Sequence, residues 1–279
     1  MMLRTLTALV LGCAACEPLD DGSTNRPLNP TSRCTTNLLT GDLACAHEVL
    51  SIDWRQVQYQ TPLGAPPAGG WPVVIMFHAS FFGGEGTWSA SLLDPLNAFG
   101  RYSQTTIVER LLDAGFAVLT PNALASWAWD TNLPPFSTVW QLAPDNQYML
   151  DIFAAIDRGD FGPLSATQWY AAGLSSGGYM TSRMAASYGG RFRALAIASA
   201  SWAACAGPIC NVPALPANHP PTLFLHGGAD VLVPVTTMYA YRDKLAAQGI
   251  PNRAVVDPLF MHGWISASPD EVLRWFTTY

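Results

Sequence analysis

Charged residues are scarce in this 279-residue chain, and the few basic ones are scattered. Charged side chains make up 12% of the sequence against 49% hydrophobic residues, and the net charge is −6. Without a basic run to follow a phosphate backbone, the sequence predicts no binding to nucleic acid. Internal repeats, metal-ligand spacings and glycine loops of the phosphate-binding type are also missing from the sequence, so we expect neither a metal nor a cofactor.

Long apolar runs are missing as well, and the amino terminus holds only a short one. Residues 6–11 are too few to span a bilayer, but they follow Arg4 and precede small residues and a cysteine, which predicts a signal peptide over residues 1–16. A cysteine after small residues also resembles the bacterial lipoprotein processing box, whose cysteine is lipidated. Cys13 fits that box better, whereas Cys16 leaves a longer apolar region, and a plain cleaved signal is the alternative. We therefore expect export to the periplasm, the medium or the outer cell surface, with a lipid anchor as the first hypothesis.

The next segment, residues 17–33, is too polar and too rich in proline to bury a core, which predicts a flexible linker. Residues 34–279 then form a single catalytic domain, because their number and apolar content suit one large core. This domain contains four cysteines, Cys34, Cys45, Cys205 and Cys210. An even count in an exported chain predicts two disulfides. Pairing neighbours in the sequence joins the first to the second and the third to the fourth, although three connectivities are possible.

Strand-like and helix-like segments alternate through the catalytic domain. The strands are expected at 73–77, 116–120, 169–172, 194–198, 222–225 and 253–256, and the helices at 106–114, 145–157, 179–188, 236–248 and from a capping box at 268–271. Such alternation predicts an α/β fold with a mostly parallel sheet and helices on both faces. The segment 205–221 is too short for a large cap, so we expect an open cleft.

The sequence Gly173-Leu-Ser-Ser-Gly177 lies between an expected strand and an expected helix. In that context a Gly-x-Ser-x-Gly pattern forms a nucleophile elbow. The glycines allow the tight turn, Ser175 is exposed as the nucleophile, and the Ser176 backbone N–H points to a developing oxyanion. The pattern alone also fits a helix that begins with small residues, so the prediction depends on its partners.

An acid and a base follow the elbow in chain order, each just after an expected strand. Asp230 lies in a glycine-rich loop and His262 in the loop after 253–256. The order Ser, Asp, His is that of the α/β-hydrolases, and the chemistry needs an imidazole to take the serine proton and a carboxylate to orient that imidazole. Asp257 is the rival acid. Four other histidines compete less well as the base: His47, His78, His219 and His226.

Three segments resemble polyhydroxybutyrate depolymerases and the related feruloyl and acetylxylan esterases. They are the elbow with its continuation to Met184, the His-Gly-x-x-Asp-x-x-Val-Pro segment at 226–234 and the His-Gly-Trp at 262–264. The resemblance covers about residues 49–275. It implies an α/β-hydrolase fold and an oxyanion turn at 78–80, where the Ser80 backbone N–H is the second donor. Ala79 replaces the family's glycine there and would be strained if that position has a positive φ.

Aromatic residues follow several expected strands and would then border the site. The candidate substrate contacts are Phe81, Trp129, Trp202 and Trp264. We expect a serine esterase that acts on short acyl esters of about two to four carbons, aromatic-acid esters or polyhydroxyalkanoate-type polyesters, since an open cleft would bury little of a long acyl chain. The alternatives are a serine peptidase of the prolyl-oligopeptidase type, against which the missing propeller argues, and a non-catalytic surface lipoprotein.

Overall fold

The computed structural model describes residues 32–206 and 208–279, so the expected signal peptide, both candidate lipidation sites and all but the end of the linker lie outside the described residues. The strands are β1 Cys34–Thr36, β2 Leu43–Cys45, β3 Glu48–Ile52, β4 Arg55–Gln60, β5 Trp71–Phe77, β6 Ser89–Ala90, β7 Ala117–Pro121, β8 Leu164–Leu174, β9 Phe192–Ala198, β10 Thr222–Gly227 and β11 Asn252–Asp257. The helices are α1 Arg101–Asp113, α2 Pro144–Arg158, α3 Ser176–Tyr188, α4 Val235–Ala247 and α5 Ser268–Thr278, with 3-10 turns η1 Glu85–Thr87, η2 Pro95–Phe99, η3 Leu124–Ser126, η4 Trp140–Leu142 and η5 Gly189–Arg191.

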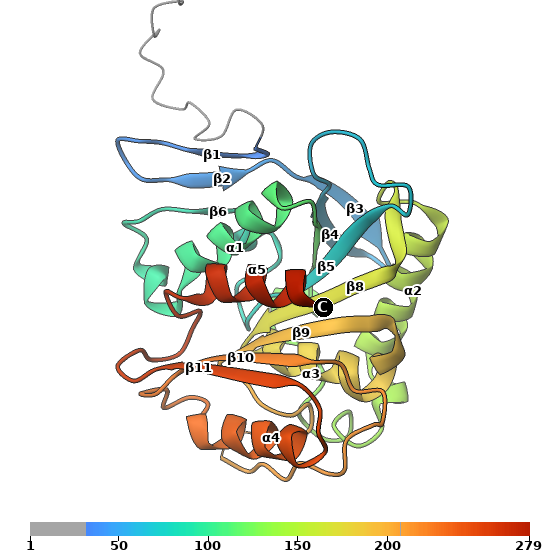
Figure 1. Ribbon diagram of the computed structural model, residues 1–279, viewed down its shortest axis with the longest axis vertical. Coiled ribbons are helices and arrows are strands. Elements are labelled where there is room, and N and C mark those ends of the chain that lie inside the picture. The colour runs from blue at the N-terminus through green and yellow to red at the C-terminus, as the bar shows by residue number, and fades with distance from the viewer. Residues whose placement is uncertain (1–31, 207) are drawn as a thin grey trace, which may run out of the picture.

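An eight-stranded sheet forms the centre of the fold, in the order β11-β10-β9-β8-β5-β7-β4-β3 (Figure 1). The six strands from β11 to β7 are parallel, and β4 and β3 complete the sheet as an antiparallel hairpin. The carboxyl ends of the parallel strands meet at one edge. The expected mostly parallel α/β-hydrolase sheet is confirmed, whereas the β3–β4 hairpin was not expected.

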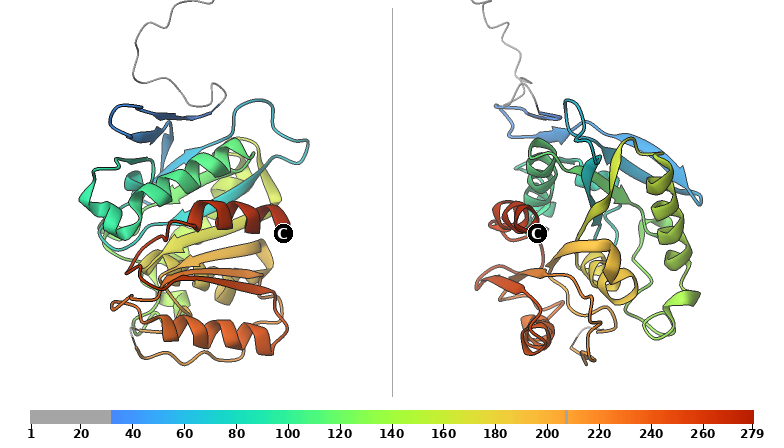
Figure 2. Two further views of the ribbon diagram at one scale, coloured as in Figure 1. Left: turned by 60° about the vertical axis from the view of Figure 1, so that its left-hand side comes forward. Right: turned by 45° about the vertical axis from the view of Figure 1, so that its right-hand side comes forward.

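Helices cover both faces of the sheet because its strands alternate their apolar side chains between the two faces. In β9, for example, Ala194, Ala196 and Ala198 face the core under α1 and α5, whereas Leu195 faces the core under α2 and α3, and Ile197 the one under α4. Such two-sided burial is typical of a parallel sheet. Figure 2 shows α1 and α5 on one side of the sheet and α2 and α3 on the other.

A second sheet of three short strands, β1-β2-β6, lies beside α1. The disulfide between Cys34 and Cys45 joins the facing residues of β1 and β2. Another disulfide joins Cys205 to Cys210 in the loop after β9. Both disulfides match the pairing of sequence neighbours.

The capping box expected at the start of α5 does not form. Ser268 is the first helical residue rather than the cap, and its buried hydroxyl has no hydrogen-bond partner among the described residues. The Glu271 carboxylate accepts hydrogen bonds from Arg253 and Arg274 instead of from the helix start. A capping box needs a serine or threonine at the cap position, and here that position is occupied by Ala267.

Candidate active site

Ser175 lies at the sharp turn between β8 and α3. Its φ of 55° and ψ of −119° belong to a backbone region that residues with a side chain rarely adopt. A Cβ on Gly177 would lie 2.0 Å from the Phe77 carbonyl oxygen, and one on Gly173 would lie 2.2 Å from the Gly177 oxygen. The Ser175 N–H donates to the Ala198 oxygen at 3.0 Å. The glycines therefore let the neighbouring backbone come close enough to hold the serine in this turn.

The loops after β10 and β11 bring the expected acid and base together. A Cβ on Gly227 would lie 1.9 Å from the Met261 oxygen, so these loops pack backbone against backbone. The Ala229 N–H also donates to the Phe260 oxygen at 3.0 Å. In this arrangement His262 Nδ1 lies 2.8 Å from Asp230 Oδ2, so the carboxylate fixes the imidazole tautomer with the proton on Nδ1.

Asp230 is buried but its surroundings favour the ionised form. Burial by itself would raise the pKa of this carboxyl, but donors from His226, His262 and the Val233 N–H hold that pKa well below its usual range. His226 Nε2 donates to the Val233 oxygen at 2.9 Å and lies 3.4 Å from Asp230 Oδ2. Asp257, the rival acid, instead accepts N–H bonds within its own turn, from residues 259 and 260.

Neither the Ser175 hydroxyl nor His262 Nε2 has a hydrogen-bond partner among the described residues. Both residues border one cavity of about 370 Å³. Hydrogen bonds between a nucleophile and its base are often long or absent without substrate and tighten when substrate binds. The structure thus places a serine hydroxyl and a histidine oriented by a carboxylate at the same cavity.

In the turn after β5, where the oxyanion site is expected, the residue with a positive φ is not the one that the sequence suggested. Ser80 borders the cavity, and its N–H makes no hydrogen bond among the described residues. The Ser176 N–H belongs to the first turn of α3 and has no intrahelical acceptor. Ala79 has no positive φ; Phe81 does, at 70°, and its N–H donates to the Trp127 oxygen. The alanine that replaces the family's glycine is therefore unstrained.

His78 holds the turn after β5 in place through two hydrogen bonds. It is fully buried, and burial lowers its pKa to about 4. Its Nε2 accepts the Ala123 N–H at 2.9 Å, so the ring proton is on Nδ1 and is donated to the Ala79 oxygen at 2.7 Å. A neutral histidine thus joins the turn after β5 to the loop after β7.

The cavity beside Ser175 has mostly apolar walls. They are formed by Phe81, Phe82, Phe99, Leu174 and Leu232. A second apolar pocket of about 250 Å³ shares Phe99 and Leu232 with the first and has Ala98, Val231 and Met261 as further walls. His262 borders both. Two apolar pockets that share one histidine suit a substrate with more than one apolar group.

A relative at high identity decides the family. The chain is 45% identical over 259 residues to a poly(3-hydroxyoctanoate) depolymerase of Pseudomonas fluorescens, across 89% of this chain and 91% of the relative. The chain belongs to the polyhydroxyalkanoate depolymerase family. It is therefore a carboxylic ester hydrolase, as the sequence motifs predicted.

Solved structures agree on the fold. A dienelactone hydrolase from Klebsiella pneumoniae subsp. pneumoniae matches with a TM-score of 0.54 at 18% identity, over 84% of this chain and 99% of that one. A thermostable esterase matches with a TM-score of 0.61 at 17% identity, over 84% of this chain and 62% of that one. No family model matches the chain. At such identities the two structures support the α/β-hydrolase fold alone.

Of the four aromatic residues expected to contact substrate, only Phe81 lies at the cavity. Trp202 is buried against Tyr241 in the core under α4, and Trp264 in the core under α1 and α5. Trp129 is buried too, where its backbone N–H donates to Ser176 Oγ and its indole N–H to the His78 oxygen. The three indoles fill the interior because their loops fold inward, so they pack beneath the site and do not line its cavity.

Three residues at the site were missed by the sequence analysis. Ser199, with a φ of 44°, accepts the Gly263 N–H at 3.0 Å and so holds the backbone next to His262. Phe99 lies in a 3-10 turn for which the sequence gives no periodic signal. Leu232 could have been found, because it lies within the 226–234 segment and only two residues after Asp230.

Proposed function

We propose that this chain hydrolyses polyesters of 3-hydroxyalkanoic acids whose alkyl side chains are of medium length. The observation that carries the proposal is the pair of apolar pockets beside Ser175 and His262, in a chain 45% identical to a depolymerase of poly(3-hydroxyoctanoate). Each repeat unit of such a polymer carries an alkyl side chain, so the units on both sides of the scissile ester present apolar groups. Phe99 and Leu232 line both pockets, and in this proposal they contact the alkyl side chains of both units.

In the proposed mechanism Ser175 Oγ attacks the ester carbonyl while His262 Nε2 takes its proton. The Ser176 and Ser80 N–H groups stabilise the oxyanion. His262 then returns the proton to the departing hydroxyl end of the chain, which leaves an acyl-enzyme on Ser175. Water next attacks the acyl-enzyme while His262 takes a proton from it, and His262 gives that proton to Ser175 Oγ as the acid is released. Asp230 stays ionised throughout and stabilises the imidazolium, which its low pKa favours.

This substrate class changes the chain-length expectation from short to medium esters. Burying each additional CH₂ gains about 0.8 kcal/mol, or roughly a fourfold rise in kcat/KM, until the pocket is filled. We expect kcat/KM for p-nitrophenyl esters to rise from acetate to octanoate, and latex of poly(3-hydroxyoctanoate) to be hydrolysed faster than poly(3-hydroxybutyrate). A maximum at acetate, with no attack on either polyester, would overturn the proposal.

The peptidase alternative lacks support of the same kind. The polyester depolymerase matches along nearly the whole chain, whereas acylaminoacyl peptidases resemble it only as folds, at 15% identity. An assay with peptide p-nitroanilides beside the esters distinguishes the two, with activity expected on the esters only.

We also propose that the enzyme is exported and anchored by a lipid on Cys13 or Cys16. Two disulfides support an oxidising compartment. None of the helices among residues 32–206 and 208–279 is long and apolar enough to cross a membrane. Mass spectrometry of the protein from its native host should find an acylated cysteine at the mature amino terminus; a terminus at another residue would exclude the anchor.

A further inference from the structure

The turn between β3 and β4 contains a tryptophan that folding does not explain. Ile52 pairs with Arg55, so Asp53 and Trp54 form a two-residue hairpin turn. Both turn residues have a positive φ, 48° and 62°. Turns of this type favour Asn-Gly or Asp-Gly, because glycine adopts a positive φ without a steric penalty. The chain instead has a bulky residue there, and its side chain is fully exposed.

An exposed indole contributes no packing to the folded state, and a glycine would suit this backbone better. A tryptophan in this position therefore indicates a role outside the fold, since backbone strain of this kind collects at functional sites.

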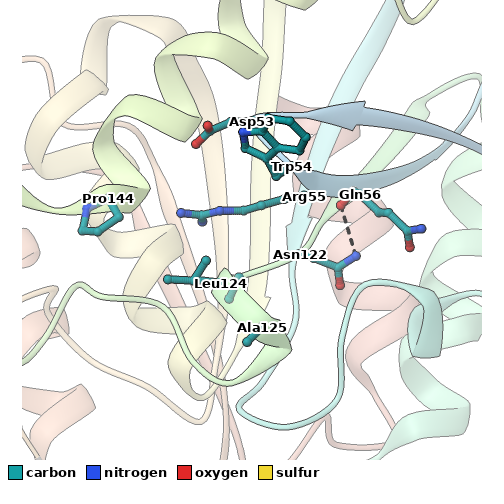
Figure 3. A pocket seen from close by; sticks show the side chains of 9 residues that line it. Asp53, Trp54, Arg55, Gln56, Asn122, Leu124, Ala125 and Pro144 are labelled. Atoms are coloured by element: carbon teal, nitrogen blue, oxygen red, sulfur yellow. Dashed lines mark hydrogen bonds between the residues drawn. The ribbon is translucent and has the colours of Figure 1, made fainter.

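Trp54 forms one wall of a pocket of about 410 Å³ (Figure 3). Leu124, Ala125 and Pro144 form other walls. Arg55 also lines the pocket and is drawn between Trp54 and Leu124 in Figure 3, with its side chain mostly buried. The pocket thus combines an exposed aromatic face with aliphatic walls and a guanidinium.

The guanidinium of Arg55 is held in place and already neutralised. Its Nη1 donates to the buried carboxylate of Asp145, and its carbon lies 4.3 Å from the centre of the Tyr148 ring. Among the described residues, every hydrogen bond of this guanidinium uses Nη1. The other N–H groups make no hydrogen bond among the described residues, and the 6% of the side chain that is exposed is what a ligand in the pocket could reach. With the Arg55 charge paired and the Asp53 carboxylate at the pocket, a neutral acceptor suits this site better than an anion.

The pocket is connected to the catalytic site along the carboxyl edge of the sheet. β4 is separated from β8 by β5 and β7, so its start lies about 14 Å from the elbow at a spacing of about 4.8 Å per strand. The loop after β7 links the two places: Leu124 lines the pocket, and Trp127 packs its ring on that of Phe81 with centroids 5.1 Å apart. Trp127 and Phe81 are both largely exposed. Exposed apolar side chains of this loop thus lie both at the pocket, where Leu124 is, and beside the cavity, where Trp127 contacts Phe81.

We propose that the Trp54 pocket binds a segment of the polyester several repeat units away from the ester being cleaved. This inference rests on the proposed function. A 3-hydroxyalkanoate polyester has only acceptor oxygens and alkyl side chains, which match the free N–H groups of Arg55 and the face of Trp54. The pocket acts only on polymers, because a short soluble ester bound at Ser175 does not reach it.

Adsorption to polymer tests the pocket separately from catalysis. In a Ser175→Ala background, we would measure binding isotherms on poly(3-hydroxyoctanoate) latex for the protein that keeps Trp54 and for its Trp54→Ala and Trp54→Phe variants. Leu150→Ala, which removes an exposed apolar side chain from α2 away from every described pocket, is the matched control. Trp54→Ala should raise the half-saturating concentration about tenfold, while Trp54→Phe and Leu150→Ala stay within twofold. In the active enzyme, Trp54→Ala should slow latex hydrolysis similarly and leave kcat/KM for p-nitrophenyl octanoate within twofold.

Adsorption of Trp54→Ala equal to that of the parent would overturn the proposal. So would an equal loss on p-nitrophenyl octanoate, which indicates a structural role, or a change of mass in light scattering without a change in adsorption, which indicates contact with a second copy of the chain. If the wild-type enzyme releases no hydroxy acid from the latex, the proposed function fails, but the isotherms still decide whether Trp54 binds the polymer.

Discussion

Several turns in the described part of the chain place a non-glycine residue at a positive φ, and two of them, the elbow and the β3–β4 hairpin, are held in different ways. At the elbow, glycines at 173 and 177 let the backbone close around Ser175, and its N–H is bonded to β9. At the β3–β4 hairpin, Trp54 is fully exposed and only the turn itself fixes its conformation. Surrounding backbone keeps the strained serine directed to the cavity, whereas the tryptophan is directed to solvent. In our proposals the first turn performs the chemistry and the second binds the polymer on which that chemistry acts.

The largest difference between the two turns should appear when the Ser175 hydroxyl is removed. Ser175→Ala should lower kcat by about four to six orders of magnitude on p-nitrophenyl octanoate and on polyester alike, as losses of a triad nucleophile do. Trp54→Ala should affect the polyester alone. Steady-state rates on both substrates measure this, with circular dichroism to confirm folding. Activity that survives in Ser175→Ala but disappears in Ser176→Ala would move the nucleophile by one residue.

The acid that supports the elbow should show a smaller but still large effect. Asp230→Asn should lower kcat about 10⁴-fold, because an amide favours the wrong tautomer of His262. Asp257→Asn is the matched control, since that carboxylate bonds only to its own turn, and it should cost less than tenfold. If Asp257→Asn is the more damaging of the two, the assignment of the acid is wrong.

The stability of the folded domain should also depend on pH, because it buries two histidines, whereas the Asp53–Trp54 turn contains no histidine. Burial lowers the pKa of His78 and of His219 to about 4, so the unfolded chain binds more protons than the folded one between about pH 6.5 and pH 4. The free energy of unfolding should therefore fall as the pH drops through that window, by up to about 3 kcal/mol for each histidine at about 1.4 kcal/mol per pH unit.

Urea denaturation at several pH values checks this, with His219→Gln expected to reduce the slope. The depressed pKa of Asp230 adds stability that is present above about pH 4 and is lost only in stronger acid. A free energy of unfolding that stays flat from pH 6.5 to pH 4.5 would contradict the buried neutral histidines.

The smallest expected effect is a gain in stability when glycine replaces either strained residue. A positive φ costs a side-chain-bearing residue about 1–2 kcal/mol, and glycine loses part of that gain through chain entropy, so Trp54→Gly and Ser175→Gly should each add up to about 1 kcal/mol. Thermal denaturation would show a rise of roughly 2–4 °C. Trp54→Gly keeps soluble-ester activity and Ser175→Gly loses it. A destabilised Trp54→Gly would mean that the indole packs within the fold after all.

The sequence predicted the central part of the fold well, because its parallel strands are buried on both faces and form continuous apolar runs. The expected strands at 73–77 and 194–198 fall within β5 and β9. The expected nucleophile, acid and base follow β8, β10 and β11, and the structure brings the acid to hydrogen-bonding distance of the base. Their catalytic roles stay predictions.

What the sequence did not reveal depends on side-chain direction and on very short elements. β1 and β2 have three residues each, too few for a period to emerge. Trp202 and Trp264 follow strands as a cleft wall would, but a loop can fold its tryptophan inward, and these do. Asp-Trp is not a turn signal, so the hairpin at Trp54 could not be predicted.

The most direct test of the account is to identify the residue that carries the acyl group during polyester hydrolysis. The enzyme would be acid-quenched within milliseconds of mixing with oligomers of 3-hydroxyoctanoate, digested, and analysed by mass spectrometry. We predict a hydroxyoctanoyl adduct, or an oligomer of it, on Ser175 in the peptide that spans the elbow. Turnover of the oligomer with no adduct on Ser175, or with the adduct on another residue, would contradict the proposed function and its site together.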